Sequence, residues 1–138
     1  MLFRSRRENI LEFYECFLDG LPSSHIDYDA RRRDRAVATS RHAALERIAT
    51  IIRRLESEAL LHTDAVIWVR MEDSVEREVE EPFLTSSIGR ELQTLSSHTI
   101  HHFALIAVTL RAHGLPVDPE FGMAPSTLRH LSARKEAA

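Results

Sequence analysis

An unbroken helical pattern runs from Ser86 to Gly114 and sets narrow limits on how this chain can fold. Apolar residues recur along it at spacings of three and four, which places them on one face of a helix. Thr85, Ser86 or Ser87 can cap its beginning, and Gly114 followed by Pro116 ends it because proline cannot continue a helix. A helix of this length must bury its apolar face, so the pattern predicts an inner helix of a bundle.

Two further stretches have the same periodicity. Residues 2–19 form one apolar stripe that Gly20 terminates, and residues 36–61 form a longer amphipathic pattern. A short final helix begins near Pro125. We therefore expect an all-α protein, an up-down helix bundle that forms a single domain over residues 1–138.

The periodicity changes between the second and third long helices. Residues 65–71 are rich in β-branched and aromatic side chains, and residues 75–83 alternate between apolar and charged ones. Residues 72–74 can turn between them. The sequence thus predicts a small β-hairpin or extended excursion before the last long helix.

Composition and charge exclude several classes of function. The formal net charge is −3 and the arginines are interspersed with carboxylates, so we expect no nucleic-acid partner. The longest apolar runs fall short of the ~20 residues that span a bilayer, and the N-terminus has no apolar segment of signal-peptide length. The only cysteine, Cys16, lies among apolar residues and suits a buried structural thiol. These features predict a cytoplasmic protein without membrane association.

Two histidines in the long helix indicate metal-ligand chemistry. His98 and His102 are four residues apart, which places them about 40° apart around a helix. Both lie on the apolar face, whereas His101 lies toward its edge. Such a pair can chelate a divalent metal through imidazole nitrogens, with a third ligand from another helix. The same spacing also arises by chance, and histidines satisfied in the core or at the surface are the alternative interpretation.

The remaining histidines have no paired spacing and suit surface or capping roles. Among them, His25 and His42 are reserve ligands. Asp27, Tyr28 and Arg31 could line the mouth of a pocket, but an Asp-rich turn held by its own hydrogen bonds explains them equally well.

Four segments of the chain resemble the DinB/YfiT-like superfamily of metal-binding four-helix bundles. They are Ile26–Asp34, Ser87–Leu92, Ser97–Ile106 and Phe121–Leu128, and the third contains the His-x-x-x-His element. The resemblance implies that His98 and His102 are two of three His ligands to Zn, Ni or Fe. It also implies a low-molecular-weight thiol or another small molecule as substrate, activated by the metal.

The chain departs from the family pattern near its N-terminus. Related sequences carry a His-rich stretch where this chain has residues 4–14, and the expected ligand falls at Asn9, one turn before Glu12. Glu12 and Asn9 are therefore the candidate third ligands, although Asn is a poor ligand for a borderline metal. The first helix of the family is also missing, which leaves an apolar groove for a second subunit to cover. A homodimer is expected.

Two functional hypotheses follow from the resemblance. The first is a divalent-metal-dependent enzyme, a thiol transferase or a hydrolase-like protein of unknown substrate. The second is a degenerate, non-catalytic bundle protein that acts in binding or assembly after losing its metal site.

Overall fold

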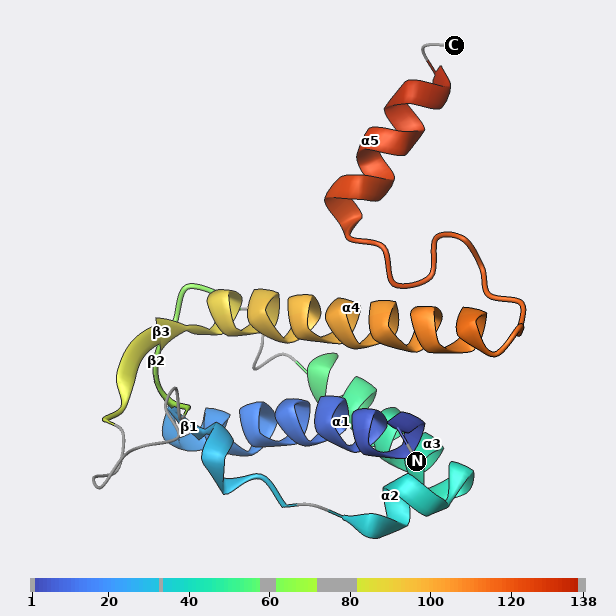
Figure 1. Cartoon of the computed structure of the whole chain (residues 1–138). Helices are drawn as coiled ribbons and strands as arrows, with labels where there is room; N and C mark the ends of the chain where they lie inside the picture. Colours follow the sequence, from blue (N-terminus) through green and yellow to red (C-terminus); the bar gives the residue numbers. More distant parts are fainter. Residues whose placement is uncertain (1, 33, 58–61, 72–81, 137–138) are drawn as a thin grey trace. The chain divides into compact units, whose positions relative to one another are not determined.

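The computed structural model describes residues 2–32, 34–57, 62–71 and 82–136. The chain divides into two compact units, Met1–Leu95 and Ser96–Ala138, and the fold is given for each unit in turn. Figure 1 shows the order of the elements along the chain, coloured from blue to red.

The first unit begins with helix α1 (Leu2–Gly20), which agrees with the predicted first helix. Its apolar stripe includes Phe17 and Leu18, and both side chains are buried in the core of the unit. After Gly20 the chain turns through a 3₁₀ segment, η1 (Leu21–Ser23), where Pro22 prevents the α-helix from continuing. The helix therefore ends where its sequence requires.

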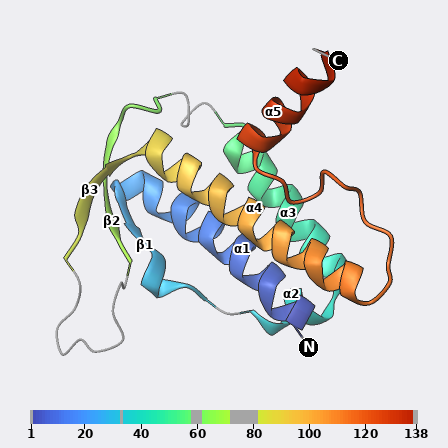
Figure 2. The same cartoon turned by 45° about the horizontal axis from the view of Figure 1, so that its top comes forward.

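Two helices occupy the stretch that was predicted as one, namely α2 (Arg35–Thr39) and α3 (Arg41–Leu55). The prediction is wrong at Ser40, whose backbone is extended and whose hydroxyl accepts a hydrogen bond from the Ala43 N–H at 3.2 Å. Ser40 thus caps α3 and separates the two helices. Both helices contact α1, and Figures 1 and 2 show α1 and α3 side by side. The predicted last turn, residues 58–61, lies outside the described residues.

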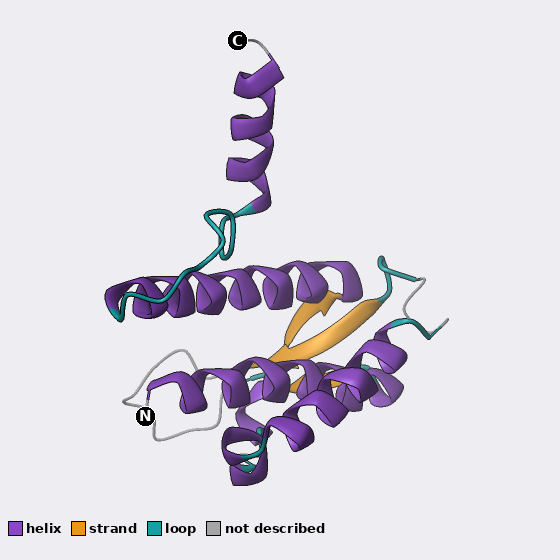
Figure 3. Ribbon diagram, turned by 90° about the vertical axis from the view of Figure 1, so that its right-hand side faces the viewer, coloured by secondary structure: helices purple, strands orange, loops and turns teal. Residues whose placement is uncertain are grey.

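A three-stranded sheet completes the first unit, in the order β1-β2-β3. Strand β1 (His25–Asp27) pairs in parallel with β2 (Val66–Arg70), and β2 pairs in antiparallel with β3 (Leu84–Ser87). Figure 3 shows the strands in orange beside the helices in purple. The prediction of an all-α bundle is therefore wrong, because strand residues Ile26 and Ile67 belong to the same core as the helices.

The sheet was hard to predict from the sequence because two of its strands, β1 and β3, are short and show no alternating pattern. The β1 strand has three residues, too few to show an alternating pattern, and it gains its partner from a distant segment. The predicted strand at 65–71 agrees with β2, but its partner β3 lies in residues that read as a helix cap. The predicted second strand falls largely on residues 72–81, which lie outside the described residues.

The core of the first unit draws on every layer of it. The fully buried side chains come from helix α1, strands β1 and β2, the 3₁₀ segment η2 (Tyr28–Ala30) and the first turns of helix α4 (Ile88–Ala112). They include Phe17, Ile26, Tyr28, Ile67 and Leu95, each at most 1% exposed. Burial of side chains this large contributes about 1.5–3 kcal/mol each, so the sheet is as important to the core as α1.

The second unit begins within α4, whose bounds agree with the long helix predicted from the sequence. The helix ends in a Schellman motif: Gly114 has a φ of +70°, its N–H donates to the Arg111 carbonyl, and the Leu115 N–H donates to the Leu110 carbonyl. Gly114 supplies the left-handed conformation that this motif needs.

The chain then returns onto α4 within the same unit. Phe121 stacks on Phe103 with ring centroids 5.0 Å apart, and Gly122 approaches so closely that a Cβ would lie 2.5 Å from the Ala104 nitrogen. Helix α5 (Pro125–Glu136) follows. In the parts of the chain that are described, no helix is long and apolar enough to cross a membrane.

Candidate functional site

The two histidines of the long helix lie together in the second unit. The Nε2 atoms of His98 and His102 are 3.1 Å apart, and the two rings meet edge to face with centroids separated by 4.4 Å. At this distance one imidazole donates its N–H to the other, in a direction set by the tautomers. His101 lies beside them, its ring centroid 5.5 Å from that of His102.

The candidate third ligands belong to the first unit. Glu12 is a buried residue of α1 in the first unit, and the side chain of Asn9 lies outside what the structure describes. The reserve ligands have other contacts: His25 stacks on Trp68, and His42 lies 3.3 Å from the Glu46 carboxylate on the surface of α3.

These positions correct the prediction of a metal-binding protein. Among the described residues, no group of three or more His, Cys, Asp or Glu side chains is arranged to hold a metal ion. Helical spacing brings two imidazoles together, but a stable site needs further ligands from other elements. The assignment of His98 and His102 as ligands stays a prediction that rests on the pair alone.

A buried hydrogen-bonded cluster, which the sequence did not indicate, joins the sheet to the start of α4. The Tyr28 hydroxyl, in the 3₁₀ segment η2 (Tyr28–Ala30), donates to Glu91 Oε2 at 3.0 Å. The Ser86 hydroxyl donates to Glu91 Oε1 at 2.6 Å. Burial, followed by the Glu91 charge, raises the pKa of Tyr28 well above its ordinary value. The phenol therefore stays protonated, and the cluster is structural.

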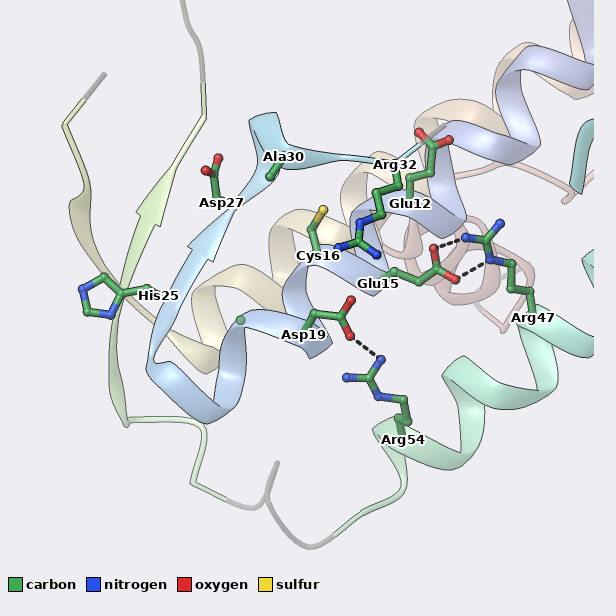
Figure 4. A pocket seen from close by; sticks show the side chains of 11 residues that line it. Glu12, Glu15, Cys16, Asp19, His25, Asp27, Ala30, Arg32, Arg47 and Arg54 are labelled. Carbon is green, nitrogen blue, oxygen red and sulfur yellow. Dashed lines mark hydrogen bonds and ion pairs between the residues drawn. The ribbon is translucent and has the colours of Figure 1, made fainter. Parts of the chain in front are cut away.

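A pocket of about 380 Å³ lies between α1, α3 and the segment after β1. Figure 4 shows two ion pairs there: Glu15 accepts from Arg47 at 2.5 and 2.8 Å, and Asp19 accepts from Arg54 at 2.7 Å. We call it the charged pocket. Two of its three arginines, Arg47 and Arg54, are held by carboxylates of α1, so these pairs tie α1 to α3.

The thiol of Cys16 lines the charged pocket, with Arg32 nearby in Figure 4. Burial, partly offset by the charge of Arg31, raises the pKa of Cys16 to about 11. Such a thiol is almost wholly protonated at neutral pH and is a poor nucleophile. The charged pocket therefore lacks the activated nucleophile that thiol chemistry would need.

The three residues predicted for a pocket mouth have separate roles. Asp27 lines the charged pocket, and a hydrogen bond from Arg70 lowers the pKa of its carboxyl. Tyr28 is buried, and the Arg31 guanidinium lies 4.3 Å from the centre of the Phe13 ring. The Asp27 side chain also accepts from the Asp29 N–H at 3.0 Å, as expected of an Asp-rich turn.

A second pocket, of about 570 Å³, lies between the end of α1, η1, the last turns of α3 and the start of α4. Its lining is mostly apolar, and its volume falls in the range of about 300–1,000 Å³ that is typical of small-molecule sites. We call it the apolar pocket. Its apolar wall consists of Leu18, Leu21, Pro22 and Ile88, and its polar rim consists of Thr50, Arg53, Arg54 and Ser57.

Sequence reasoning missed the apolar pocket, although one signal was present. Leu21 and Pro22 form an apolar pair directly after a helix end, where solvated residues are more usual. The other wall residues looked like core positions of separate helices. Only their convergence in space makes a cavity.

Comparisons with known proteins contradict the predicted family. No family model matches the chain, and no solved structure matches it. The chain is similar to a protein of the FK506-binding class. That relative is FK506-binding protein 5 of Rhizopus delemar, which is 38% identical over 133 residues, covering 90% of this chain and 34% of the relative. The chain thus spans about a third of the relative's length.

This match corrects the predicted membership of the DinB/YfiT-like superfamily. A His-x-x-x-His element and short helix-forming runs can recur in unrelated helices, whereas the similarity to the FK506-binding protein extends over most of this chain. The predicted metal-dependent thiol transferase or hydrolase-like enzyme is withdrawn with the family, as is the degenerate member of it.

Proposed function

We propose that this chain is a binding domain whose apolar pocket receives an apolar group of a peptide or small molecule. The observation that carries the proposal is the pocket itself, a mostly apolar cavity of about 570 Å³ that residues of α1, η1, α3 and α4 line within the first unit. Binding in such a cavity is favourable because it removes apolar surface of the ligand and of the pocket from water.

Two further observations support the apolar pocket over the other candidates. Two of the three arginines that line the charged pocket, Arg47 and Arg54, are already paired with carboxylates, and its thiol is protonated at neutral pH. The relative is named for binding FK506, a largely apolar molecule, and FK506 is therefore a suitable probe.

A binding assay with a plugged pocket tests the proposal. Titration with FK506 and with a labelled, uncharged Ala-Leu-Pro-Gln peptide is followed by fluorescence anisotropy or calorimetry. Ser57→Trp places an indole on the rim of the pocket and should weaken binding about tenfold or more, which corresponds to ~1.4 kcal/mol. Ala49→Trp is the matched control, because Ala49 is an exposed α3 residue that does not line the pocket.

The outcomes separate the pocket from the rest of the surface. Equal binding by Ser57→Trp, Ala49→Trp and the unaltered chain would show that the ligand lies elsewhere. If neither probe binds the unaltered chain, the proposed function is wrong.

A second candidate function is catalysis of Xaa-Pro isomerisation in a bound peptide, favoured by the match to an FK506-binding protein. Rotation about the peptide bond has a barrier of ~18–20 kcal/mol that comes from amide resonance. An apolar pocket disfavours the charge-separated resonance form and so lowers this barrier without an acid, base or metal. Isomerisation of the same Leu-Pro peptide, measured with and without Ser57→Trp, distinguishes catalysis from binding alone.

The proposed location is the cytoplasm. The support for it is compositional, since the chain has one cysteine and needs no disulfide. Fractionation of cells that express the tagged chain should recover it with cytosolic markers, and recovery with membranes would contradict the proposal.

A further inference from the structure

The polar rim of the apolar pocket carries a guanidinium, that of Arg53, which no carboxylate of the described residues neutralises. Arg54 donates to Asp19 at 2.7 Å, so its charge is paired. Arg53 instead donates to the Thr50 hydroxyl at 3.1 Å, and within the described residues it makes no ion pair. In the part of the chain that the structure describes, the pocket therefore combines an apolar wall with the positive charge of Arg53.

We infer that the natural ligand of the apolar pocket is a peptide segment with a carboxylate beside its apolar residue, which Arg53 recognises. The inference rests on the proposed binding function and specifies its ligand. Charge complementarity supports it, since a ligand carboxylate would supply the opposite charge that Arg53 does not meet among the described residues at the edge of an apolar surface.

The rim chemistry favours a peptide over a fatty chain. The Ser57 side chain places a hydroxyl group on the same rim as Arg53, whereas the Thr50 hydroxyl already donates to the Glu46 carbonyl at 3.0 Å and accepts from Arg53. The Ser57 hydroxyl can donate to a carbonyl or accept from an N–H of a bound peptide, whereas an alkyl chain has no group that forms a hydrogen bond. A Glu that follows an apolar residue would bring its carboxylate to Arg53 while the apolar side chain fills the pocket.

A structural role for Arg53 is the competing explanation. Arg53 lies in the last turn of α3, where a positive charge interacts favourably with the helix dipole. That role requires only a positive charge and acts on stability. Ligand recognition acts on the preference between charged and uncharged peptides, and the two roles can be measured separately.

The experiment compares two labelled peptides, Ala-Leu-Pro-Glu and Ala-Leu-Pro-Gln, each with blocked ends, by fluorescence anisotropy at low and high salt. The unaltered chain should bind the Glu peptide up to about fivefold more tightly at low salt, with the ratio approaching one as salt screens the pair. Arg53→Gln should abolish the preference, and Arg53→Lys should retain part of it. Arg41→Gln removes the same charge from the exposed start of α3 and should leave the preference unchanged.

Each outcome decides the inference. Equal affinity for the two peptides in the unaltered chain overturns it while the proposed function stands. A preference that survives in Arg53→Gln overturns the role of Arg53. Absence of binding by both peptides and by FK506 overturns the proposed function together with the inference. Urea unfolding of each variant confirms that the proteins compared are folded.

Discussion

At the scale of single residues, the buried Glu91 carboxylate shows how tertiary contacts assign a role that sequence position conceals. Glu91 lies in the first turn of α4, where an acidic residue is common because it interacts favourably with the helix dipole. In the structure it is 6% exposed and accepts hydrogen bonds from Tyr28 and Ser86. A buried carboxylate without such donors would cost several kcal/mol, so these two hydroxyls make its position tolerable.

The Tyr28→Phe substitution tests this cluster, because it removes one donor and preserves the ring. We expect a loss of about 1–2 kcal/mol in the free energy of unfolding, measured by urea denaturation. Ser86→Ala should cost a similar amount. The double variant should differ from the sum of the two, since both residues serve one carboxylate.

A change below about 0.5 kcal/mol for Tyr28→Phe would place it among ordinary surface substitutions and contradict the cluster's role. The sequence could not reveal this contact because 63 positions separate the two residues.

At the scale of elements, Gly20 and Gly114 both follow predicted helices but act differently. Gly114 has a positive φ and completes a Schellman motif, as a helix-ending glycine usually does. Gly20 has a φ of −80°, which any residue adopts, and its backbone approaches strand β1 instead. A Cβ at Gly20 would lie 2.4 Å from the His25 carbonyl oxygen. Both helix ends were predicted correctly. The expected reason, a glycine in the left-handed conformation, applies to Gly114 and does not apply to Gly20.

The Gly20→Ala substitution tests which effect governs stability at this position, helix propensity or the close approach to β1, because the two predict changes of opposite sign. Helix propensity alone predicts stabilisation by about 1 kcal/mol, because alanine is the better helix former. The close approach to β1 predicts destabilisation by about 1–3 kcal/mol, because the obstructing atoms belong to backbone. We expect destabilisation in thermal and urea unfolding. Increased stability would show that the backbones of α1 and β1 can move apart enough to accommodate a methyl group at position 20.

The helices themselves were the most predictable elements. Three of the predicted helices agree closely with α1, α4 and α5, since their apolar stripes, caps and breakers act within a few residues. The long helix predicted over 36–61 fails at Ser40, where a side-chain cap competes with the helical pattern. Local sequence patterns thus predicted where the helices lie but not the break between α2 and α3 at Ser40.

At the scale of the whole molecule, the predicted single domain and homodimer stay predictions. The chain divides into two compact units, and it spans about a third of its relative, FK506-binding protein 5. The binding proposal accordingly concerns the first unit, where the apolar pocket lies.

The predicted homodimer can be tested by sedimentation equilibrium of the purified chain at micromolar concentration. A dimer should have twice the 15.8 kDa mass of the chain and should dissociate on dilution. A strictly monomeric species that remains folded would contradict the prediction.

The sequence by itself determined the positions of most helices, the end of α4 at Gly114 and a charge balance that argues against nucleic-acid binding. The tertiary structure decided that a sheet shares the core with the helices and that an apolar pocket forms beside Arg53. It also showed that, among the described residues, no group of three or more His, Cys, Asp or Glu side chains is arranged to hold a metal ion. The physical reason is the range of the forces involved. Caps and periodic burial depend on residues within a few positions, whereas strand pairing, ligand sets and cavities depend on residues that meet only when the chain has folded.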